Sequence, residues 1–459
     1  MQKLFEKGFD AVLGQVELWL AEGNNEQLSN LIDDAYPQDI AEILEELDEA
    51  ERNAFFKLIP PEKAAEVMEE LDTEDFSEIL RTLTLEKKEA ILDDMADDDI
   101  VDHLMELDEK RQKEIISYLD SDDAADVREL LVYEEDTAGG IMTKDYVVLK
   151  KDYSIAKAIS KLRATAPEAE TIYYVFVIDR GNKLVGVISL RELIVAKEET
   201  VIEQIMNDNV IYVNVNDDQE EVARVVSKYD LLAVPVVDDQ GQLQGIITVD
   251  DIIDVIEEEA TEDILKFAGS SELEDIEEDR FFRKVGYSIR SRLPWLIVTI
   301  FGGLLSASVV SGFQNTLDAN ATLAMFMPIL AGMGGNVGTQ SSTLTVRAIA
   351  MGYIEGMEAL RTIGHEVLTG LLVGLVCSGI VGVTSLFLGG DMMLAVIVGL
   401  AMWANMVTAA TIGTIVPLVF KKVGVDPAVA SAPFITTTVD ITGLTIYFTL
   451  ATLMMKSLM

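Results

Sequence analysis

The chain has 459 residues, of which 49% are hydrophobic, so its length predicts two or three folded domains and its composition argues against disorder. Its 80 acidic residues outnumber its 35 basic residues and give a formal net charge of -45, which excludes a nucleic-acid partner held by basic contacts to phosphate. With one cysteine, Cys377, the chain cannot form an intrachain disulfide or a thiolate metal site.

The negative charge is concentrated in the first part of the chain. Residues 291–459 hold 6 basic and 7 acidic side chains, whereas the preceding residues hold 29 basic and 73 acidic ones. Long uncharged runs of membrane-spanning length occur only in the later part. The first residues scatter charges among apolar side chains, unlike a signal peptide. The sequence therefore predicts a cytosolic front part and a membrane-embedded rear part.

A short theme recurs within residues 1–133, which we expect to form an acidic helical-repeat N-domain. It reads AEILEELD at 41–48, AEVMEELD at 65–72 and VDHLMELD at 101–108, with offsets of 24 and 36 residues. Each copy predicts a helix of about 10 residues that cannot bury its apolar stripe alone. The copies are therefore expected to stack as an α-solenoid.

Residues 134–256 change to alternating β-branched runs joined by helical segments, and this region also repeats. Ile141 and Met142 recur as Ile205 and Met206, and YVFVIDRGNKLVGVISLREL aligns with AVPVVDDQGQLQGIITVDDI 59 residues later. This arrangement resembles a tandem pair of cystathionine-β-synthase-type (CBS) domains, which have an α+β fold.

The resemblance implies that an adenosine nucleotide such as ATP could bind between the two copies. Matching positions make the candidate contacts Tyr174, Arg191, Thr248 and Asp251. Glu192 occupies the position of a ribose-binding Asp, and Leu231 stands where an aromatic residue could stack on adenine. Both departures weaken the nucleotide hypothesis, and a purely structural CBS pair is the alternative.

Residues 257–290 form a polar stretch that turns basic just before the first apolar run, and we expect a connecting helix here. Acidic clusters occur at 97–99, 257–259 and 262–263. Most acidic runs are only solvated faces, but crowded carboxylates repel one another and divalent cations can relieve that repulsion. With a membrane pore behind them, these clusters become a candidate ion sensor.

Residues 291–459 predict an all-α transmembrane domain of five helices. The apolar segments are 293–317, 319–346, 367–390, 392–420 and 427–455. Basic residues precede the first segment and mark the second and fourth connections, whereas the first and third connections have none. By the positive-inside rule, the N-terminal part is cytosolic and the C-terminus is external.

Asp440 lies near the middle of the fifth apolar segment, where a carboxylate costs about 2.5–3.5 kcal/mol to insert. No Lys or Arg lies within the apolar segments to pair with it, so the acid is expected to face an ion pathway. The alternative is an acid that is protonated or satisfied by hydroxyls such as those of Thr437, Thr438 and Thr442.

The run from Gly332 to Ser342, GMGGNVGTQSS, places glycines and polar side chains at membrane depth. Irregular or loosely packed backbone survives there only inside protein or beside a water-filled cavity. Asn336, Thr339 and Gln340 would then add neutral oxygens to a pore charged by Asp440. The alternative is that the glycines serve close helix packing.

Carboxylate and amide oxygens suit the hard cations Mg²⁺, Ca²⁺ and Mn²⁺. Mg²⁺ loses its waters reluctantly, so one or two carboxylates that contact the hydrated ion are enough to hold it. Mg²⁺ and Mn²⁺ both meet these requirements.

The order of these parts resembles the MgtE family of magnesium channels over essentially the whole chain. Six strings carry the resemblance: KAAEVMEEL, YEEDTAGGIMT, TVDDIIDVIEEEATEDI, GGNVGTQ, GVDPA and TTVDITGL. The resemblance implies a homodimer in the bacterial inner membrane, with a pore on the two-fold axis that closes when cytosolic Mg²⁺ is high. Ala432 departs from family members that have Asn at this position, close to the pore mouth.

Site residues follow from the matching motifs. The pore would be lined by Asp440, Asn336, Thr436 and Gln340. Regulatory Mg²⁺ would be bound by acids of the N-domain (Glu66, Asp98 and Asp102), of the CBS pair (Glu220, Asp230, Asp251 and Asp254), and of the connecting "plug" helix and the pore mouth (Glu259, Glu262, Asp263 and Asp426).

The leading hypothesis is thus a Mg²⁺-selective, Mg²⁺-gated channel. Within transport, the alternatives are a coupled exchanger or a channel for Mn²⁺ or Co²⁺. From another class comes a non-transporting membrane sensor that reports nucleotide or metal levels through the CBS pair. An enzyme is not expected, because no nucleophile-and-base set, P-loop or metal-hydrolase motif occurs.

Overall fold

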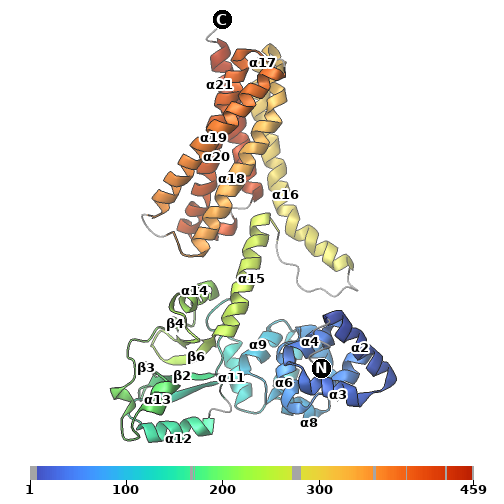
Figure 1. Cartoon of the computed structure of the whole chain (residues 1–459), viewed down its shortest axis with the longest axis vertical. Coiled ribbons are helices and arrows are strands. Elements are labelled where there is room, and N and C mark those ends of the chain that lie inside the picture. The colour runs from blue at the N-terminus through green and yellow to red at the C-terminus, as the bar shows by residue number, and fades with distance from the viewer. Residues whose placement is uncertain are drawn as a thin grey trace. The chain divides into compact units, whose positions relative to one another are not determined.

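The structure is a computed structural model that describes residues 8–165, 169, 171–270, 281–354, 358–388, 390–429 and 432–456. The chain forms two compact units, Met1–Ile256 and Glu257–Met459 (Figure 1). The first unit contains short helices followed by two small sheets, and the second contains the long apolar helices.

The front of the first unit is a series of short helices, as the repeats predict. The helices are α2 (Phe9–Glu22), α3 (Asn25–Asp34), α4 (Pro37–Glu46), α5 (Glu49–Phe56), α6 (Pro61–Glu69), α7 (Thr73–Thr82), α8 (Leu85–Leu92), α9 (Asp97–Met105), α10 (Glu109–Ile116) and α11 (Asp123–Leu130). The three copies of the theme form α4, α6 and α9. The aspartate that ends each copy begins the next helix, because its side chain accepts hydrogen bonds from exposed backbone N–H groups: Asp48 does so for α5, Asp72 for α7 and Asp108 for α10.

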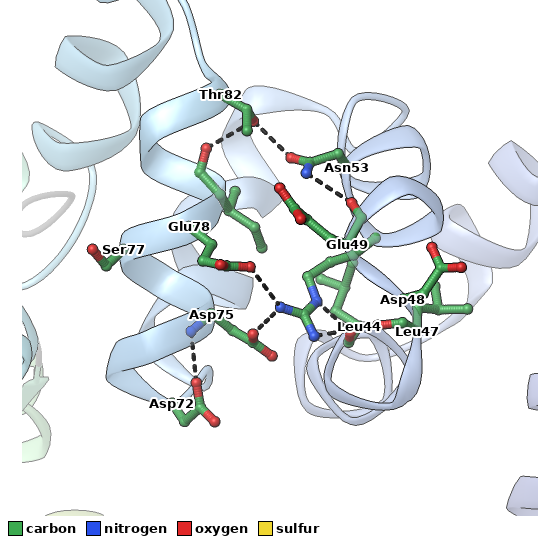
Figure 2. A network of polar contacts seen from close by, with 12 residues as sticks. Leu44, Leu47, Asp48, Glu49, Asn53, Asp72, Asp75, Ser77, Glu78 and Thr82 are labelled. Atoms are coloured by element: carbon green, nitrogen blue, oxygen red, sulfur yellow. Dashed lines mark hydrogen bonds and ion pairs between the residues drawn. The ribbon is translucent and has the colours of Figure 1, made fainter. Parts of the chain in front are cut away.

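Arg52 of α5 joins the end of α4 to α7, and Figure 2 labels its partners Leu44, Leu47, Asp75 and Glu78. Its guanidinium donates to the carbonyl oxygens of Leu44 at 2.9 Å and Leu47 at 3.2 Å, at the end of α4. The same side chain pairs with the buried carboxylate of Asp75 and lies 3.5 Å from a carboxylate oxygen of Glu78, both on α7. One cation thus satisfies the end of one helix and neutralises acids on another.

The same position recurs elsewhere in the repeat with a different side chain. Gln112 donates to the carbonyl oxygens of Leu104 at 2.8 Å and Leu107 at 3.1 Å. Arg52 and Gln112 each follow their two acceptors by 8 and 5 residues, so the repeat keeps a capping donor for its exposed carbonyl groups. In the middle copy, His103 contacts the equivalent carbonyl oxygen, that of Met68, at 3.1 Å.

Replacing Arg52 by alanine is expected to destabilise the first unit by about 3 kcal/mol, because Asp75 would stay buried without its cation. Denaturant unfolding followed by circular dichroism measures the change. Lys113→Ala is the matched control, since Lys113 pairs with Glu109 at an exposed site and should change stability by less than about 0.5 kcal/mol. Equal stability of the two variants would contradict the structural role of Arg52.

The rest of the first unit contains two sheets of the same topology. One has the order β1 (Tyr146–Lys150), β2 (Thr171–Ile178), β3 (Leu184–Ser189), and the other β4 (Val213–Asn214), β5 (Ala233–Val237), β6 (Leu243–Thr248). In each, the first pair is parallel and the second antiparallel. The helices around them are α12 (Ile155–Thr165), α13 (Leu190–Val195), α14 (Gln219–Tyr229) and α15 (Val249–Ala268), and a short 3₁₀ turn, η2, covers Ile202–Gln204.

The two copies interlock through the motifs that repeat in sequence. A β-carbon on Gly245 would lie 2.7 Å from the sulfur of Met142, and one on Gly186 would lie 2.5 Å from the sulfur of Met206. Each methionine therefore packs against the glycine of the other copy. Backbone bridges join Thr143 to Ile246 and Val187 to Asn207 at the same places. The repeated Ile-Met pair serves to join the copies.

The segment YEEDTAGGIMT joins the helical repeats to the CBS pair. Gly139 packs against the ring of Tyr133, and the backbone around Gly140 touches the carbonyl oxygens of Glu134 and Glu135, so neither glycine leaves room for a β-carbon. Buried apolar side chains continue without a break from the repeats into the second CBS copy. The repeats and the CBS pair thus share one core.

Among the described residues of the second unit, five helices are long and apolar enough to cross a membrane: Val285–Gly312, Ala321–Ala350, Glu358–Phe387, Met392–Val423 and Ala432–Lys456. The corresponding elements are α16 (Phe281–Gly312), α17 (Gln314–Ala319), η4 (Ala321–Phe326), α18 (Met327–Ala350), α19 (Glu358–Phe387), α20 (Met392–Val423), η5 (Pro427–Val429) and α21 (Ala432–Lys456). The prediction of five spans is confirmed.

Two predicted boundaries need correction. The first span ends at Gly312 and a separate short helix follows, whereas the sequence predicted one segment to 317. The third span begins at Glu358, nine residues before the predicted start, so Glu366 lies inside it. The predicted segment contained uncharged residues only, and it therefore left out Glu366, an acid that the tertiary structure buries.

In the expected connector 257–290, α15 continues from the CBS pair to Ala268, and residues 271–280 lie outside the described residues.

Within the membrane unit, α18 packs against both α20 and α21, α19 packs along α20, and α16 packs on α21 (Figure 1). Glycines allow these close approaches: a β-carbon on Gly370 of α19 would lie 3.0 Å from that of Ala410 on α20. Because lipid provides no hydrophobic force between helices, small residues at such crossings are needed for dense packing.

Candidate ion pathway and cytosolic acidic sites

The helices α18 and α21, which carry the predicted pore residues, lie in direct contact. A β-carbon on Gly335 would lie 3.2 Å from the methyl group of Thr436, and one on Gly338 would lie 2.9 Å from Ile435. Asp440 follows Thr436 by one helical turn and therefore lies on the same face of α21. The structure thus brings Asp440 and Thr436 to the helix that carries Asn336 and Gln340.

The polar side chains of the glycine-rich motif lie on the surface of the single chain. Asn336 and Gln340 are exposed and, being four residues apart, share one face of α18. Asn336 directly follows Gly335, the residue packed against Thr436. An exposed amide face on a membrane-spanning helix is costly in lipid, so this face needs water or protein against it.

Asp440 is half-buried, and its carboxylate makes no hydrogen bond or ion pair with any of the described residues. Two of the three hydroxyl groups suggested as its partners donate elsewhere. Thr438 donates to the carbonyl oxygen of Phe434 at 2.9 Å, and Thr442 donates to that of Thr438 at 2.9 Å. Thr437 packs against Gly302 of α16. These contacts favour the prediction that Asp440 faces an ion pathway over the alternative that hydroxyl groups satisfy it.

The glycines of the motif do not form irregular backbone. α18 is a continuous helix through the motif, and Gly334, Gly335 and Gly338 are all buried against neighbouring helices. The alternative of close helix packing is therefore correct for these three glycines, and the expectation of irregular or loosely packed backbone is wrong. The reason is geometric: the glycines occupy the packed face, while Asn336 and Gln340 occupy the opposite side.

Asn405 of α20, which the sequence did not single out, sits where three helices meet. Its side chain is 1% exposed and donates to the carbonyl oxygen of Leu330 at 2.8 Å. A β-carbon on Gly334 would come within 2.5 Å of the Asn405 amide nitrogen, and Gly443 is packed equally closely against its oxygen. The glycine of α18 and that of α21 thus provide space for one amide. No donor in the described part of the chain reaches that oxygen.

Lys266, also unpredicted, lies between two of the predicted regulatory acids. Its ammonium is 2.6 Å from a carboxylate oxygen of Glu262 on the same helix and 3.0 Å from one of Asp426, beside η5. Partial burial alone would lower the pKa of Lys266, but the bonds and charges of Glu262 and Asp426 outweigh it and raise that pKa. The Glu-x-x-x-Lys spacing was visible in the sequence, but the contact with Asp426 was not.

The end of α15 also contacts the start of α21 and the middle part of α16. Gly269 has a φ of 74°, which favours glycine, and a β-carbon there would lie 3.1 Å from Pro433 of α21 and 3.2 Å from Trp295 of α16. The hydroxyl groups of Ser270 and Ser291 are 3.4 Å apart. The connecting helix therefore reaches the end of the helix that carries Asp440. Glu259 and Asp263 are half-buried on the same segment.

The other predicted regulatory acids lie on several elements of the first unit. Glu66 is exposed on α6, Asp98 is half-buried and Asp102 exposed on α9, and Glu220 is half-buried on α14. Asp230 ends α14 with a φ of 50°, and Asp254 is exposed on α15. In the CBS pair these acids are thus clustered on α14 and α15, which follow β4 and β6.

The strongest crowding of carboxylates joins Asp97, from the predicted cluster at 97–99, to aspartates that the sequence did not single out. Burial and the charges of Asp145, Asp123 and Asp126 raise the pKa of Asp97 to about 7. One carboxylate oxygen from each of Asp93, Asp120 and Asp123 lies within 4.8 Å of the others, a spacing that a divalent cation could bridge. Acid runs at 93–99 and 120–123 were visible in the sequence, but only the fold brings them together.

A cavity of about 450 Å³ lies in the CBS pair, a size suited to a small molecule. Its lining comes from the first copy, including Tyr173, Tyr174, Ser189 and Arg191, and from Leu232 of the second. Two of the four predicted nucleotide contacts, Tyr174 and Arg191, line this cavity, and Thr248 and Asp251 are not among its lining residues. Leu231 packs against the core, so Leu232 occupies the position that we expected for Leu231.

The acids after β3 and β6 act as helix caps. Glu192 accepts hydrogen bonds from the backbone N–H of Ser189 at 2.9 Å and from its hydroxyl at 2.7 Å. Asp251 accepts the same pair of bonds from Thr248, at 3.1 Å and 2.6 Å. Burial raises the pKa of Asp251, although the bonds from Thr248 oppose this. Glu192 therefore has a structural reason to be present without a ribose.

Three family models match the parts of the chain in this order. Residues 35–136 match the MgtE intracellular N domain, residues 138–199 and 202–258 match CBS domains, and residues 327–450 match MgtE, a divalent cation transporter. The magnesium transporter MgtE of Thermus thermophilus is 40% identical over 335 residues, covering 72% of this chain and 73% of that protein. The chain belongs to the MgtE family of magnesium transporters. The MgtE of Enterococcus faecalis is 42% identical over 337 residues, covering 72% of each chain.

The MgtE relationship extends to a solved structure. The cytosolic domain of the Mg²⁺ channel MgtE in complex with ATP superposes with a TM-score of 0.51 and 40% identity, covering 53% of this chain and 99% of that one. The present MgtE-family chain is therefore a multi-pass membrane protein whose helical N domain and CBS pair are cytosolic. Its MgtE relatives are transporters, which confirms the expectation that it is not an enzyme.

Proposed function

We propose that this chain is a Mg²⁺-selective, Mg²⁺-gated channel that mediates magnesium uptake across the bacterial inner membrane and closes when cytosolic Mg²⁺ is high. The observation that carries the proposal is the half-buried Asp440, which has no bonding partner in the described bundle and lies on the helix packed against the Asn336 segment. A carboxylate surrounded by amide and hydroxyl groups suits a hydrated Mg²⁺ ion.

The pore is formed by two copies of the chain. Asn336 and Gln340 are exposed on the single chain, and a membrane helix cannot leave such amides in lipid without cost. A two-fold axis beside this face would cover both amides and place two Asp440 carboxylates around one pathway, lined also by Thr436. In this arrangement the C-terminus is external, in agreement with the distribution of basic residues.

Gating uses the repulsion between acids. At low Mg²⁺, the carboxylates of the N-domain, the CBS pair and the plug segment repel one another, and bound Mg²⁺ removes that repulsion and favours the closed arrangement. The crowding of Asp97 and Asp123 with Asp145 supports this reading, since Asp145 directly precedes β1 of the CBS pair. We retain as functional parts 1–133 (sensor), 134–256 (CBS pair), 257–290 (plug) and 291–459 (pore).

Current through planar lipid bilayers containing the full-length protein tests this proposal, because Mg²⁺ can be set separately on each face. We expect a Mg²⁺ current that falls as Mg²⁺ on the cytosolic face rises. No current from folded, inserted protein would overturn the channel and favour a non-transporting sensor. Equal Mn²⁺ or Co²⁺ currents would overturn the selectivity, and a strict need for a counter-ion would favour an exchanger.

Lys266 is expected to set how strongly the gate depends on Mg²⁺. Lys266→Gln removes the cation between Glu262 and Asp426, so their contact then needs an external divalent ion. The current without cytosolic Mg²⁺ should rise about two- to fivefold, the effect of a partly screened ion pair of about 0.5–1 kcal/mol. Lys113→Gln breaks an exposed Glu–Lys pair of the same spacing on α10 and should leave the current unchanged. Equal currents in both variants would exclude this role.

We further propose that the CBS cavity binds ATP, with Arg191 contacting phosphate and Tyr174 contacting the base or ribose. Arg191→Ala should weaken ATP binding about tenfold or more, because a charge-assisted hydrogen bond is lost. Isothermal titration of the purified protein measures this, with Arg163→Ala on α12 as the control for lost positive charge. Absence of ATP binding at millimolar concentration would favour a purely structural CBS pair.

A further inference from the structure

The membrane unit contains a second buried acid, to which the proposed mechanism gives no role. Glu366 lies on α19, inside the third membrane span, and is 8% exposed. One carboxylate oxygen accepts a hydrogen bond of 2.7 Å from the hydroxyl of Ser341 on α18, which is 3% exposed. The other lies 3.6 Å from the ring of His365, whose side chain is 79% exposed. Ionisable residues within membrane spans usually serve the transport pathway.

The hydrogen bond from Ser341 to Glu366 joins α18 to α19 where the two helices meet. α19 packs along α20 over most of its length and meets α18 only over a short stretch. Gly370, one turn after Glu366, lets α19 approach α20 closely, and Gly413 of α20 touches Gly338 and Ser341 of α18. The small residues on both sides of α20 allow a side chain of α19 to reach α18.

Ser341 points away from the proposed pathway face on α18. At 100° per residue, Gln340, Asn336 and Thr339 lie about 100°, 140° and 160° around the helix from Ser341. A bond that fixes Ser341 therefore fixes the direction in which the polar face points. The Ser341 hydroxyl and the Glu366 carboxylate are both buried, so the hydrogen bond is shielded from water. Breaking it leaves a buried polar group without a partner.

We propose that Glu366 is a positioning residue for ion selectivity, which holds α18 through Ser341 so that the Asn336 face points into the pathway. The inference rests on the proposed function. Glu366→Ala and Ser341→Ala both remove the contact, whereas Glu366→Gln keeps an acceptor oxygen of nearly the same size. Glu358→Gln is the matched control, because Glu358 is an exposed acid at the start of the same helix.

Two measurements on the full-length protein test the proposal. The first is the ratio of Mg²⁺ to Ca²⁺ current in planar bilayers, which should fall about tenfold in Glu366→Ala and in Ser341→Ala, and by the same amount in the double variant. Glu366→Gln and Glu358→Gln should keep the ratio within about twofold of the wild type. Additive effects of the two alanine substitutions would overturn a shared role.

The second measurement does not depend on current. In a Cys377→Ser background, which removes the only native cysteine, Thr339→Cys reports exposure of the polar face through its rate of reaction with a membrane-impermeant thiol reagent. The rate should fall about tenfold when Glu366→Ala is added and should stay unchanged with Glu366→Gln. If wild type carries no current, the proposed function fails, while this rate still tests the contact.

Two outcomes would overturn the positioning role. Glu366→Gln could lower the ratio of Mg²⁺ to Ca²⁺ current as much as Glu366→Ala does, while Ser341→Ala leaves the ratio unchanged. The carboxyl group of Glu366 would then act through its charge or its proton. If every variant keeps the wild-type selectivity and thiol reactivity, the hydrogen bond does not orient α18.

Discussion

Asp440→Ala should reduce the Mg²⁺ current by roughly two orders of magnitude. In the proposed two-fold symmetric pore the substitution removes two carboxylates, and each charge-assisted contact with the hydrated ion is worth about 1.5 kcal/mol. Asp440→Asn keeps the volume and an oxygen and should retain more current than the alanine variant. The measurement is current in planar bilayers at fixed protein density, with Mg²⁺ absent from the cytosolic face.

The control for lost negative charge is Asp318→Asn. Asp318 is an exposed acid on α17, where it accepts a hydrogen bond from Gln314 at 3.0 Å, and its loss should leave the current close to wild type. A normal current in folded Asp440→Ala would mean that ions do not pass Asp440. The pathway would then have to be sought elsewhere in the membrane unit.

Gly413→Ala should have the largest effect on the stability of the membrane unit. The added β-carbon would overlap the carbonyl oxygen of Gly338 and lie 3.2 Å from the β-carbon of Ser341. A backbone atom inside a helix cannot turn aside as a side chain can, so α18 and α20 must separate. Overpacking of this kind costs about 3 kcal/mol.

The expected result is a thermal unfolding midpoint that is roughly 5–10 °C lower in detergent solution. Gly379→Ala is the matched control, since Gly379 lies on α19 with nothing within 4 Å of its β-carbon position and should tolerate alanine. Equal midpoints for the two variants would show that the two backbones do not meet as closely as described. Because Gly413 also touches Ser341, a partly folded Gly413→Ala protein should share the altered selectivity expected for Ser341→Ala.

The candidate pathway shows what a sequence can and cannot reveal about a membrane site. Asp440 and Asn336 could be selected because polar groups are conspicuous in apolar segments, and the structure places their two helices in contact. The glycines next to Asn336 on α18 were harder to interpret, since a glycine can belong to a loosely packed segment or to a close helix crossing. Only the neighbouring Asn405 and Ile435 decide in favour of the crossing.

The roles of Glu366 and Lys266 were not predicted from the sequence, for a different reason. Glu366 directly precedes the predicted third apolar segment, 367–390, and so fell outside it, although its hydrogen bond to Ser341 allows it to lie within the span. Lys266 looked like half of an ordinary helical ion pair, and its contact with Asp426 crosses 160 positions of sequence. Neither role follows from local spacing.

The sequence by itself determined the order of the parts, the helical repeats, the paired CBS copies and the five spans. Each of these depends on a local pattern: a period of apolar residues, a repeated string, or an uncharged run long enough to cross lipid. The tertiary structure alone decided which groups meet, as in the exchange of Met142 and Met206 between CBS copies and the binding of Arg52 to Asp75. Such partners depend on how helices and sheets cross, and crossing is fixed by packing over the whole unit rather than by neighbours in the chain.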